Sequence, residues 1–557
     1  MTTMPRSDEH RSGSRLSAAA ARIFGLDQRA LAAFRIGIAA TVLIDLALRA
    51  MDLQAHYTDA GVLPRQAWLA LANRPWEFSI HLMTGSWVGQ AILFALAAAC
   101  AACLLLGYRT RSATIATWAL LLSLHNRNPF VLLGADTMLR CLLFWAMFVP
   151  LGGRWSLDSR RRPAAPRRAI ASPATAALML QVCLVYWCTG VFKSHPVWTQ
   201  DGTALVYLFQ SEYATPLGAS GLAWPGLLRL LSFAALHLEL FGPLLLFVPW
   251  RRDWFRAAAV VAFVAMHLAM AATLHLGIFP LVSVVAWIPF LPAGCLDRMA
   301  RWFAASRHAD ALGQEAFAPA DGRPLAASRG RGWIAWGGDA TVVILLVLVG
   351  LWNIRTLAPR QVPWLVPEPA GALLRLVKLD QRWRMFAAKP PTSNRWISIP
   401  ARLQDGREVD LARADGEPAF RAPARSFTER EGMRWIKYRE YIRRSARGRE
   451  WYARYLCEEW RRATADDPTQ AIARLDLMLY QQKSRPDLSE RPAKRTRLFT
   501  YRPHAVATSA EDRSRSQPAV KAARSASTDR ASPGRDRRPT VAVTIPGIDA
   551  RRILGGR

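Results

Sequence analysis

Apolar runs of about 20 residues recur through the first 350 residues, and they limit the fold more than any other feature. A helix needs a run of that length to cross the hydrocarbon of a membrane. The runs lie near residues 31–51, 86–108, 112–126, 136–151, 173–193, 224–249, 256–275, 277–292 and 333–353. The third and the eighth are short enough to be tilted or re-entrant. We therefore expect an all-α polytopic membrane protein with eight or nine transmembrane helices.

The charge of the loops predicts the orientation of these helices. Short cytoplasmic loops collect Lys and Arg. The segments 1–29, 109–111, 152–172, 251–256 and 293–332 are rich in Arg, whereas 194–220 has Asp201 and Glu212 and no Lys or Arg. Nine spans fit this alternation, with the N-terminus in the cytoplasm and the C-terminus outside. The segment 1–29 has no separate apolar core with a cleavage site, so we interpret it as a cytoplasmic lead-in.

The composition changes after residue 353. Six tryptophans lie among many charges between 354 and 500, which favours a folded extracytoplasmic α+β region that is helical around 430–465. Residues 501–557 are rich in Arg, Ser, Ala and Pro and predict a disordered basic tail. The formal net charge is +32, but much of the excess lies in loops that topology explains. We expect contact with membrane lipid and no nucleic-acid partner.

Charged side chains inside apolar runs are the strongest functional signal. Lys193 ends the fifth run, and an ammonium held in hydrocarbon costs several kcal/mol, so it must reach water, find a partner or do chemistry. Asp136 and Arg140 are spaced i and i+4 and predict an ion pair. His237, Glu239 and His267 predict a polar cluster that lines a substrate cavity, and together with His275 they offer a metal or proton-relay site as the weaker alternative.

Cysteines give little further information. Cys100 and Cys103 form a C-x-x-C inside the second run, where further metal ligands and solvent access are not evident. We interpret the pair as small residues in helix packing. The sequence therefore predicts no metal site.

A family resemblance becomes specific at Lys193. Tyr186, Gly190, Val191, Lys193 and Trp198 resemble the Val-Tyr-x-x-x-Gly-Val-Lys-Lys-x-x-x-x-Trp segment of the vitamin K-dependent gamma-glutamyl carboxylases. Further matching pieces are 57–63, 124–129, 155–158, 277–279 and 381–386. Together they resemble the bacterial branch of that family, the horizontally transferred transmembrane (HTTM) domain proteins. The resemblance implies an HTTM-like domain over residues 30–353 and a bacterial cytoplasmic membrane location.

The resemblance also implies site residues. It makes Lys193 a candidate base that deprotonates a reduced quinone similar to vitamin K, while Tyr186 and Trp198 join Asp136, Arg140 and the polar cluster as candidate cavity residues. On the residues alone, Lys193 could instead snorkel to the outer interface. Asn128 matches the carboxylase pattern, but Pro129 stands where that pattern has a functional histidine. His125 is the nearby imidazole that could replace it.

Three functions remain open at this point. We favour a membrane protein that binds a lipid-phase quinone-like ligand near Lys193 and modifies or matures an exported partner. The second is an enzyme that carboxylates peptide glutamate. The third is a maturation or scaffold protein without catalysis.

Overall fold

The computed structural model describes residues 21–71, 77–161, 169–306, 333–412, 427–489 and 491–503. The chain divides into two compact units. The first comprises residues 1–396, 421–445 and 479–495, and the second comprises 397–420, 446–478 and 496–557. The predicted tail lies outside the described residues except for 501–503, and so do residues 1–20 of the predicted lead-in.

The first unit is a bundle of long helices. Six described helices are long and apolar enough to cross a membrane, namely α2 (Gln28–Ala50), α5 (Trp87–Leu106), α9 (Pro173–Phe192), α13 with its 3₁₀ extension η4 (Pro225–Phe247), α14 (Arg252–Thr273) and α18, of which Gly337–Leu357 qualifies. A bent pair, Phe279–Phe290 with Ala293–Trp302, is a further broken span or a re-entrant loop. The fold is thus a multi-pass helical one with six or seven candidate spans, and eight or nine stays a prediction.

All nine apolar runs fall on helices. The two that are not among the six or the bent pair are α6 (Thr110–Arg127) and α7 (Gly134–Ala146). Buried residues are dense on α7, where every residue from Met138 to Ala146 is buried. This helix therefore packs inside the bundle rather than against lipid along its length.

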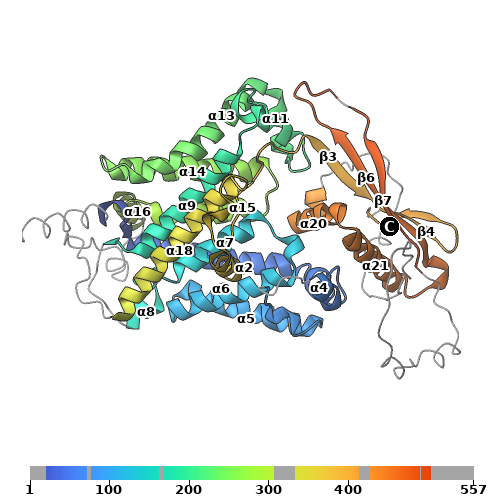
Figure 1. Ribbon diagram of the computed structural model, residues 1–557, viewed down its shortest axis with the longest axis horizontal. Helices are drawn as coiled ribbons and strands as arrows, with labels where there is room; N and C mark the ends of the chain where they lie inside the picture. Colours follow the sequence, from blue (N-terminus) through green and yellow to red (C-terminus); the bar gives the residue numbers. More distant parts are fainter. Residues whose placement is uncertain are drawn as a thin grey trace, which may run out of the picture. The chain divides into compact units, whose positions relative to one another are not determined.

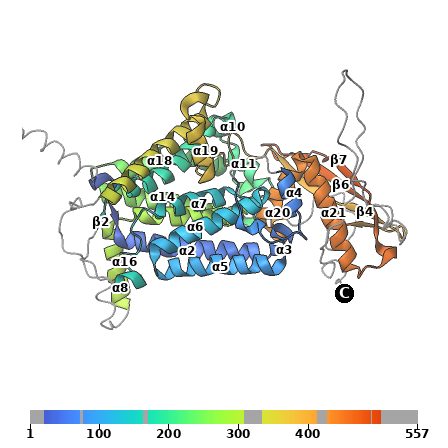
Figure 2. The same ribbon diagram turned by 60° about the horizontal axis from the view of Figure 1, so that its bottom comes forward.

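Helices that are close in the chain and helices that are distant in it both pack against one another in this unit. Figures 1 and 2 show α2, α5 and α6 side by side, and α9 packs against α18, α13 and α7. As a whole, α18 spans Trp333–Leu357, and the remaining described helices of eight or more residues in this unit are α15 (Phe279–Trp287), α16 (Ala293–Ser306), α19 (Glu368–Leu376) and α20 (Phe427–Arg444). Shorter helices are α3 (Leu53–Tyr57), α4 (Arg65–Leu71), α8 (Leu157–Arg161), α10 (Pro196–Thr199), α11 (Ala204–Phe209) and α12 (Pro216–Ser220). A two-stranded sheet pairs β1 (Leu26–Asp27) with β2 (Ala169–Ile170).

Local sequence signals set the ends of the spans. Ser172 caps α9, its hydroxyl accepting from Thr175 N, and Pro173 takes the first helical position, where its missing N–H costs nothing. Gly107 ends α5 at φ 68, a left-handed conformation that glycine adopts without strain. The α13 run continues as 3₁₀ helix after Gly242 because Pro243 cannot donate to the helical ladder.

A non-helical segment, residues 377–386, packs one side against the helical bundle: Gln381 and Trp383 are buried, whereas Arg382 and Arg384 are exposed. Gln381 exchanges hydrogen bonds with Gln181 of α9 at 2.6 and 2.9 Å. Gln181 lies eleven residues before Phe192, about 16 Å along the helix axis. Irregular backbone is tolerated at such depth only where protein or a polar lining satisfies it. Trp352 Nε1 donates to the Gln381 carbonyl at 3.2 Å, which satisfies this one backbone acceptor.

The described part of the second unit is a small α+β structure, and the region bounds 354–500 stay a prediction. Its helix is α21 (Ala446–Ala463), which confirms with α20 the helical prediction around 430–465. The strands are β3 (Ser393–Ser398), β4 (Pro400–Leu403), β5 (Glu408–Asp410), β6 (Ile472–Lys483) and β7 (Lys494–Tyr501), and three of them, β3, β6 and β7, run through both units. The sheet order is β3-β6-β4-β5, with β7 paired to β6, and β4 is antiparallel to both β5 and β6.

Candidate functional site

Lys193 stands at the C-terminal end of α9, and its side chain turns into the protein. Its backbone N–H donates to Gly190 O at 3.0 Å, which ends the helix in a tight turn. The side chain is only 6% exposed. This burial argues against a lysine that snorkels to the surface.

The partner of Lys193 is Glu239 of α13. Lys193 Nζ donates to both carboxylate oxygens at 2.6 Å. Gly190 makes the approach of the two helices possible, because a Cβ there would lie 2.8 Å from Leu240 Cδ2 and 3.5 Å from Glu239 Cβ. The glycine spaced three residues before the lysine thus has a packing reason in this fold.

Trp198 completes the surroundings of the ammonium. Lys193 Nζ lies 4.5 Å from the centroid of the Trp198 ring, a cation–π distance. The indole is fixed from its other end, since Nε1 donates to Phe386 O at 3.3 Å. Phe386 ends the segment 377–386, so this segment bears directly on the lysine site.

Tyr186, two turns before Lys193 on α9, heads a second polar group. Its hydroxyl lies 2.9 Å from His267 Nε2 of α14 and accepts from Trp287 Nε1 of α15 at 2.9 Å. His267 Nδ1 is buried and has no hydrogen-bond partner among the described residues. Phe263 stacks on Trp287 with centroids 4.1 Å apart, so the polar atoms lie in apolar surroundings.

His237 does not join either group. It is exposed, and its Nδ1 contacts Phe233 O on its own helix at 2.8 Å. Residues two positions apart lie on nearly opposite faces of a helix. His237 therefore points away from the bundle, while Glu239 on the other face is buried. The three residues thus do not form one cluster: Glu239 contacts Lys193, His267 contacts Tyr186, and His237 joins neither group.

Asp136 and Asp45 form a separate buried cluster with two arginines. Arg49 donates to Asp45 Oδ2 and to Asp136 Oδ1, both at 2.7 Å. Arg434 of α20 donates to Asp45 Oδ1 at 2.5 Å and to both oxygens of Asp136 at 3.0 Å. Two carboxylates and two guanidinium groups balance in charge, which is the condition for burying them.

The predicted pairing of Asp136 with Arg140 is wrong. Arg140 Nη1 lies 3.0 Å from His125 Nδ1, and its Nε contacts the Lys378 carbonyl at 3.4 Å. Asp136 is taken by arginines from other parts of the chain because its position at the start of α7 brings it close to α2. Its Oδ2 also accepts from Leu133 N at 2.6 Å and so caps its own helix.

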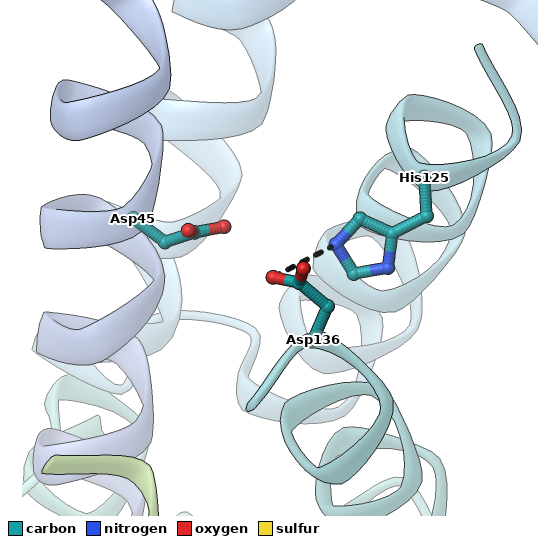
Figure 3. Close-up of side chains that lie close together, drawn as sticks. All are labelled: Asp45, His125 and Asp136. Atoms are coloured by element: carbon teal, nitrogen blue, oxygen red, sulfur yellow. Dashed lines mark ion pairs between the residues drawn. The ribbon is translucent and has the colours of Figure 1, made fainter. Parts of the chain in front are cut away.

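His125 lies between arginines rather than at the lysine site. Figure 3 shows it facing Asp136, with Nε2 3.9 Å from Oδ1, and with Asp45 directed at the same space from α2. Arg49 Nη2 lies 3.0 Å from Nε2. A neutral imidazole accepts one hydrogen bond, so it cannot accept from Arg49 and Arg140 at once.

The cluster of Asp45, His125 and Asp136 has ligand atoms within 4.8 Å of one another, the spacing of a metal site. The carboxylate oxygens that would bind an ion already accept from Arg49, Arg434 and the Leu133 N–H. A cation there would also meet two guanidinium charges. The arrangement is suited to holding α20 on the bundle, and it is poorly suited to a metal ion.

Asn128 anchors a loop. Its Nδ2 donates to His56 O at 2.9 Å, and its Oδ1 accepts from Phe130 N at 3.2 Å. Arg127 donates to the carbonyls of Leu63 at 2.8 Å and Thr58 at 3.2 Å. The segment 124–129 thus holds the loop that contains residues 56–63.

Arg49, Trp287 and Arg434 belong to these sites but are not among the residues predicted from the sequence. Arg49 is spaced i and i+4 from Asp45 inside an apolar run, a signal that could have found it. Trp287 and Arg434 carry no such signal, since Trp287 lies in a run without charged residues and Arg434 lies in a segment with many other charged residues.

The fold and these sites define a multi-pass helical membrane protein with ion pairs buried inside its bundle. Residues 25–294 match the family model of the HTTM domain, so this part of the chain is an HTTM domain. The match includes Lys193, Glu239, Trp198 and the Tyr186 group. No curated protein and no solved structure matches the chain.

Proposed function

We propose that the HTTM domain of this protein binds a lipid-phase ligand with a weakly acidic hydroxyl, such as a hydroquinone, at the Lys193–Glu239 pair. The observation that carries the proposal is a buried ammonium and carboxylate, 2.6 Å apart, between two apolar candidate spans. Intramembrane ion pairs are costly and are associated with substrate and proton pathways. An ion pair that only joins two helices needs a lysine and a glutamate. This site also contains a glycine that brings the helices together and a tryptophan that contacts the ammonium.

Access from the lipid phase is compatible with the neighbouring side chains. Val191 and Phe241, close in sequence to the pair, are exposed apolar residues. Glu239 keeps 11% of its side chain exposed, so the pair is not fully sealed. An apolar ligand carrying one polar group could therefore approach between these side chains.

Modification or maturation of an exported partner is the second part of the proposal. The resemblance to the carboxylases supports it, as does a folded region after the HTTM domain that could hold a peptide. Full carboxylase chemistry has less support, because Pro129 replaces the histidine of that pattern and the two ring nitrogens of His125 face Arg49 and Arg140 rather than the Lys193–Glu239 pair.

Lipid extraction with mass spectrometry tests the ligand proposal. The purified wild type should carry a hydroquinone or a related hydroxylated lipid above the level in empty membrane particles. A variant with both charges removed, Lys193→Met with Glu239→Leu, should lose it. A matched variant at the exposed His237→Gln should retain it. Equal lipid content in all three proteins would contradict the proposal.

A further inference from the structure

The contacts of the Lys193–Glu239 pair indicate which member can accept a proton. Lys193 Nζ donates to both oxygens of Glu239 and lies over the Trp198 ring. A carboxylate and an aromatic face both stabilise a positive charge. The amine in this arrangement is therefore an ammonium, and an ammonium has no lone pair with which to act as a base.

The carboxylate of Glu239 keeps accepting capacity. Each carboxylate oxygen has about two lone-pair positions, and the bond from Nζ uses one on each oxygen. A ligand hydroxyl that reaches Glu239 can thus donate to it without displacing Lys193. The same approach places the ligand oxygen near the ammonium.

We infer that Glu239 accepts the ligand's proton and that Lys193 remains protonated and stabilises the resulting oxyanion. This inference rests on the proposed function and reverses the roles that the resemblance to carboxylases implies. The ligand O–H bond breaks, its electron pair stays on the ligand oxygen, and a new O–H bond forms on Glu239. The total charge is unchanged, and no oxidant or reductant takes part.

Trp198 and Gly190 act in this scheme as positioning residues. Trp198 holds the ammonium through its ring and is itself fixed by Phe386 O. Gly190 keeps α13 close enough for Glu239 to reach Nζ. A preorganised cation beside the oxygen on which charge develops is the arrangement that stabilises oxyanions in enzymes.

The test uses 2-naphthol as the probe, because its anion has a distinct absorption band and its ionisation needs no redox step. The full chain in lipid nanodiscs is incubated with the probe at constant pH, and bound probe and ionised probe are measured separately. Wild type should bind and ionise it above empty nanodiscs. Glu239→Gln should lower the ionised fraction by about tenfold or more. Lys193→Arg should stay near wild type, because arginine keeps the cation.

The outcomes separate the inference from the proposed function. Loss of ionisation in Lys193→Arg, with ionisation kept in Glu239→Gln, would overturn the inference and leave the ligand site standing with lysine as base. Absence of binding to wild type would overturn the proposed function itself. If Glu239→Gln does not fold because Lys193 lacks its partner, Lys193→Arg alone decides: ionisation near the wild-type level supports the inference, and loss of ionisation with the probe still bound overturns it. His237→Gln is the control on the same helix and should match wild type.

Discussion

Removing Arg434 should destabilise the protein far more than removing an exposed arginine from the same helix. Arg434 donates to Asp45, to both oxygens of Asp136 and to Val131 O, all in the buried interior. Arg434→Met leaves the buried carboxylates of Asp45 and Asp136 with Arg49 as their remaining guanidinium partner. The buried cluster then carries a net charge of −1. Stranding a buried charge in this way costs about 3–5 kcal/mol.

The matched control is Arg444→Met. Arg444 is 74% exposed and pairs with Glu440 one turn earlier in α20, so its loss should cost less than about 1 kcal/mol. The assay is equilibrium unfolding in mixed detergent micelles. Adding Asp136→Asn to Arg434→Met restores charge balance and should recover part of the loss, with a coupling of about 0.5–3 kcal/mol. Equal effects of the two arginines, or additive losses in the double variant, would refute the assignment.

Three further predictions follow from single positions. Burial, with help from the charges of Arg434 and Arg49, lowers the pKa of His56 from 6.5 to about 3, so the folded state excludes a proton that the unfolded chain binds. The contribution of this group to the free energy of unfolding is therefore largest above about pH 6.5, and it falls towards pH 3 by up to about 1.4 kcal/mol per pH unit. The variant His56→Phe loses no hydrogen bond made by the ring and should flatten the plot of unfolding free energy against pH between pH 6.5 and 5. An unchanged slope of this plot would contradict the prediction. Gly190→Ala should cost about 1–3 kcal/mol by pushing Leu240 away, whereas Gly350→Ala, which meets nothing within 4 Å, should be neutral or stabilising in the same unfolding assay. Reporter fusions after residues 160 and 360 should give opposite signals, and matching signals would refute nine spans.

The helices could be predicted from the sequence because apolar length is a local property. Each apolar run from 31–51 to 333–353 lies on a helix, and the helical pattern around 430–465 becomes α20 and α21. The packing of 377–386 against the bundle could not be predicted. It depends on a single glutamine meeting Gln181, two hundred residues earlier in the chain, and no periodicity carries that information.

The site was predictable in its members more than in its pairings. Lys193 and Glu239 were both candidates, because charged residues in apolar runs need an explanation. Their mutual contact depends on the approach of α13 to Gly190, which only the tertiary structure gives. The predicted pair of Asp136 and Arg140 rested on helical spacing alone. In the structure the Asp136 carboxylate binds the Arg434 guanidinium of α20, which helical spacing within α7 cannot predict.

Photolabelling tests the central claim most directly, namely that the Lys193–Glu239 pair is where this HTTM domain meets a lipid-phase ligand. A photoreactive naphthol in nanodiscs, followed by peptide mass spectrometry, would map its position on the full chain. We expect label on the peptides of α9 and α13 that flank the pair, and its loss in Lys193→Met with Glu239→Leu. Label concentrated on α5 or α18, or label at α9 and α13 that persists in the uncharged variant, would contradict the claim.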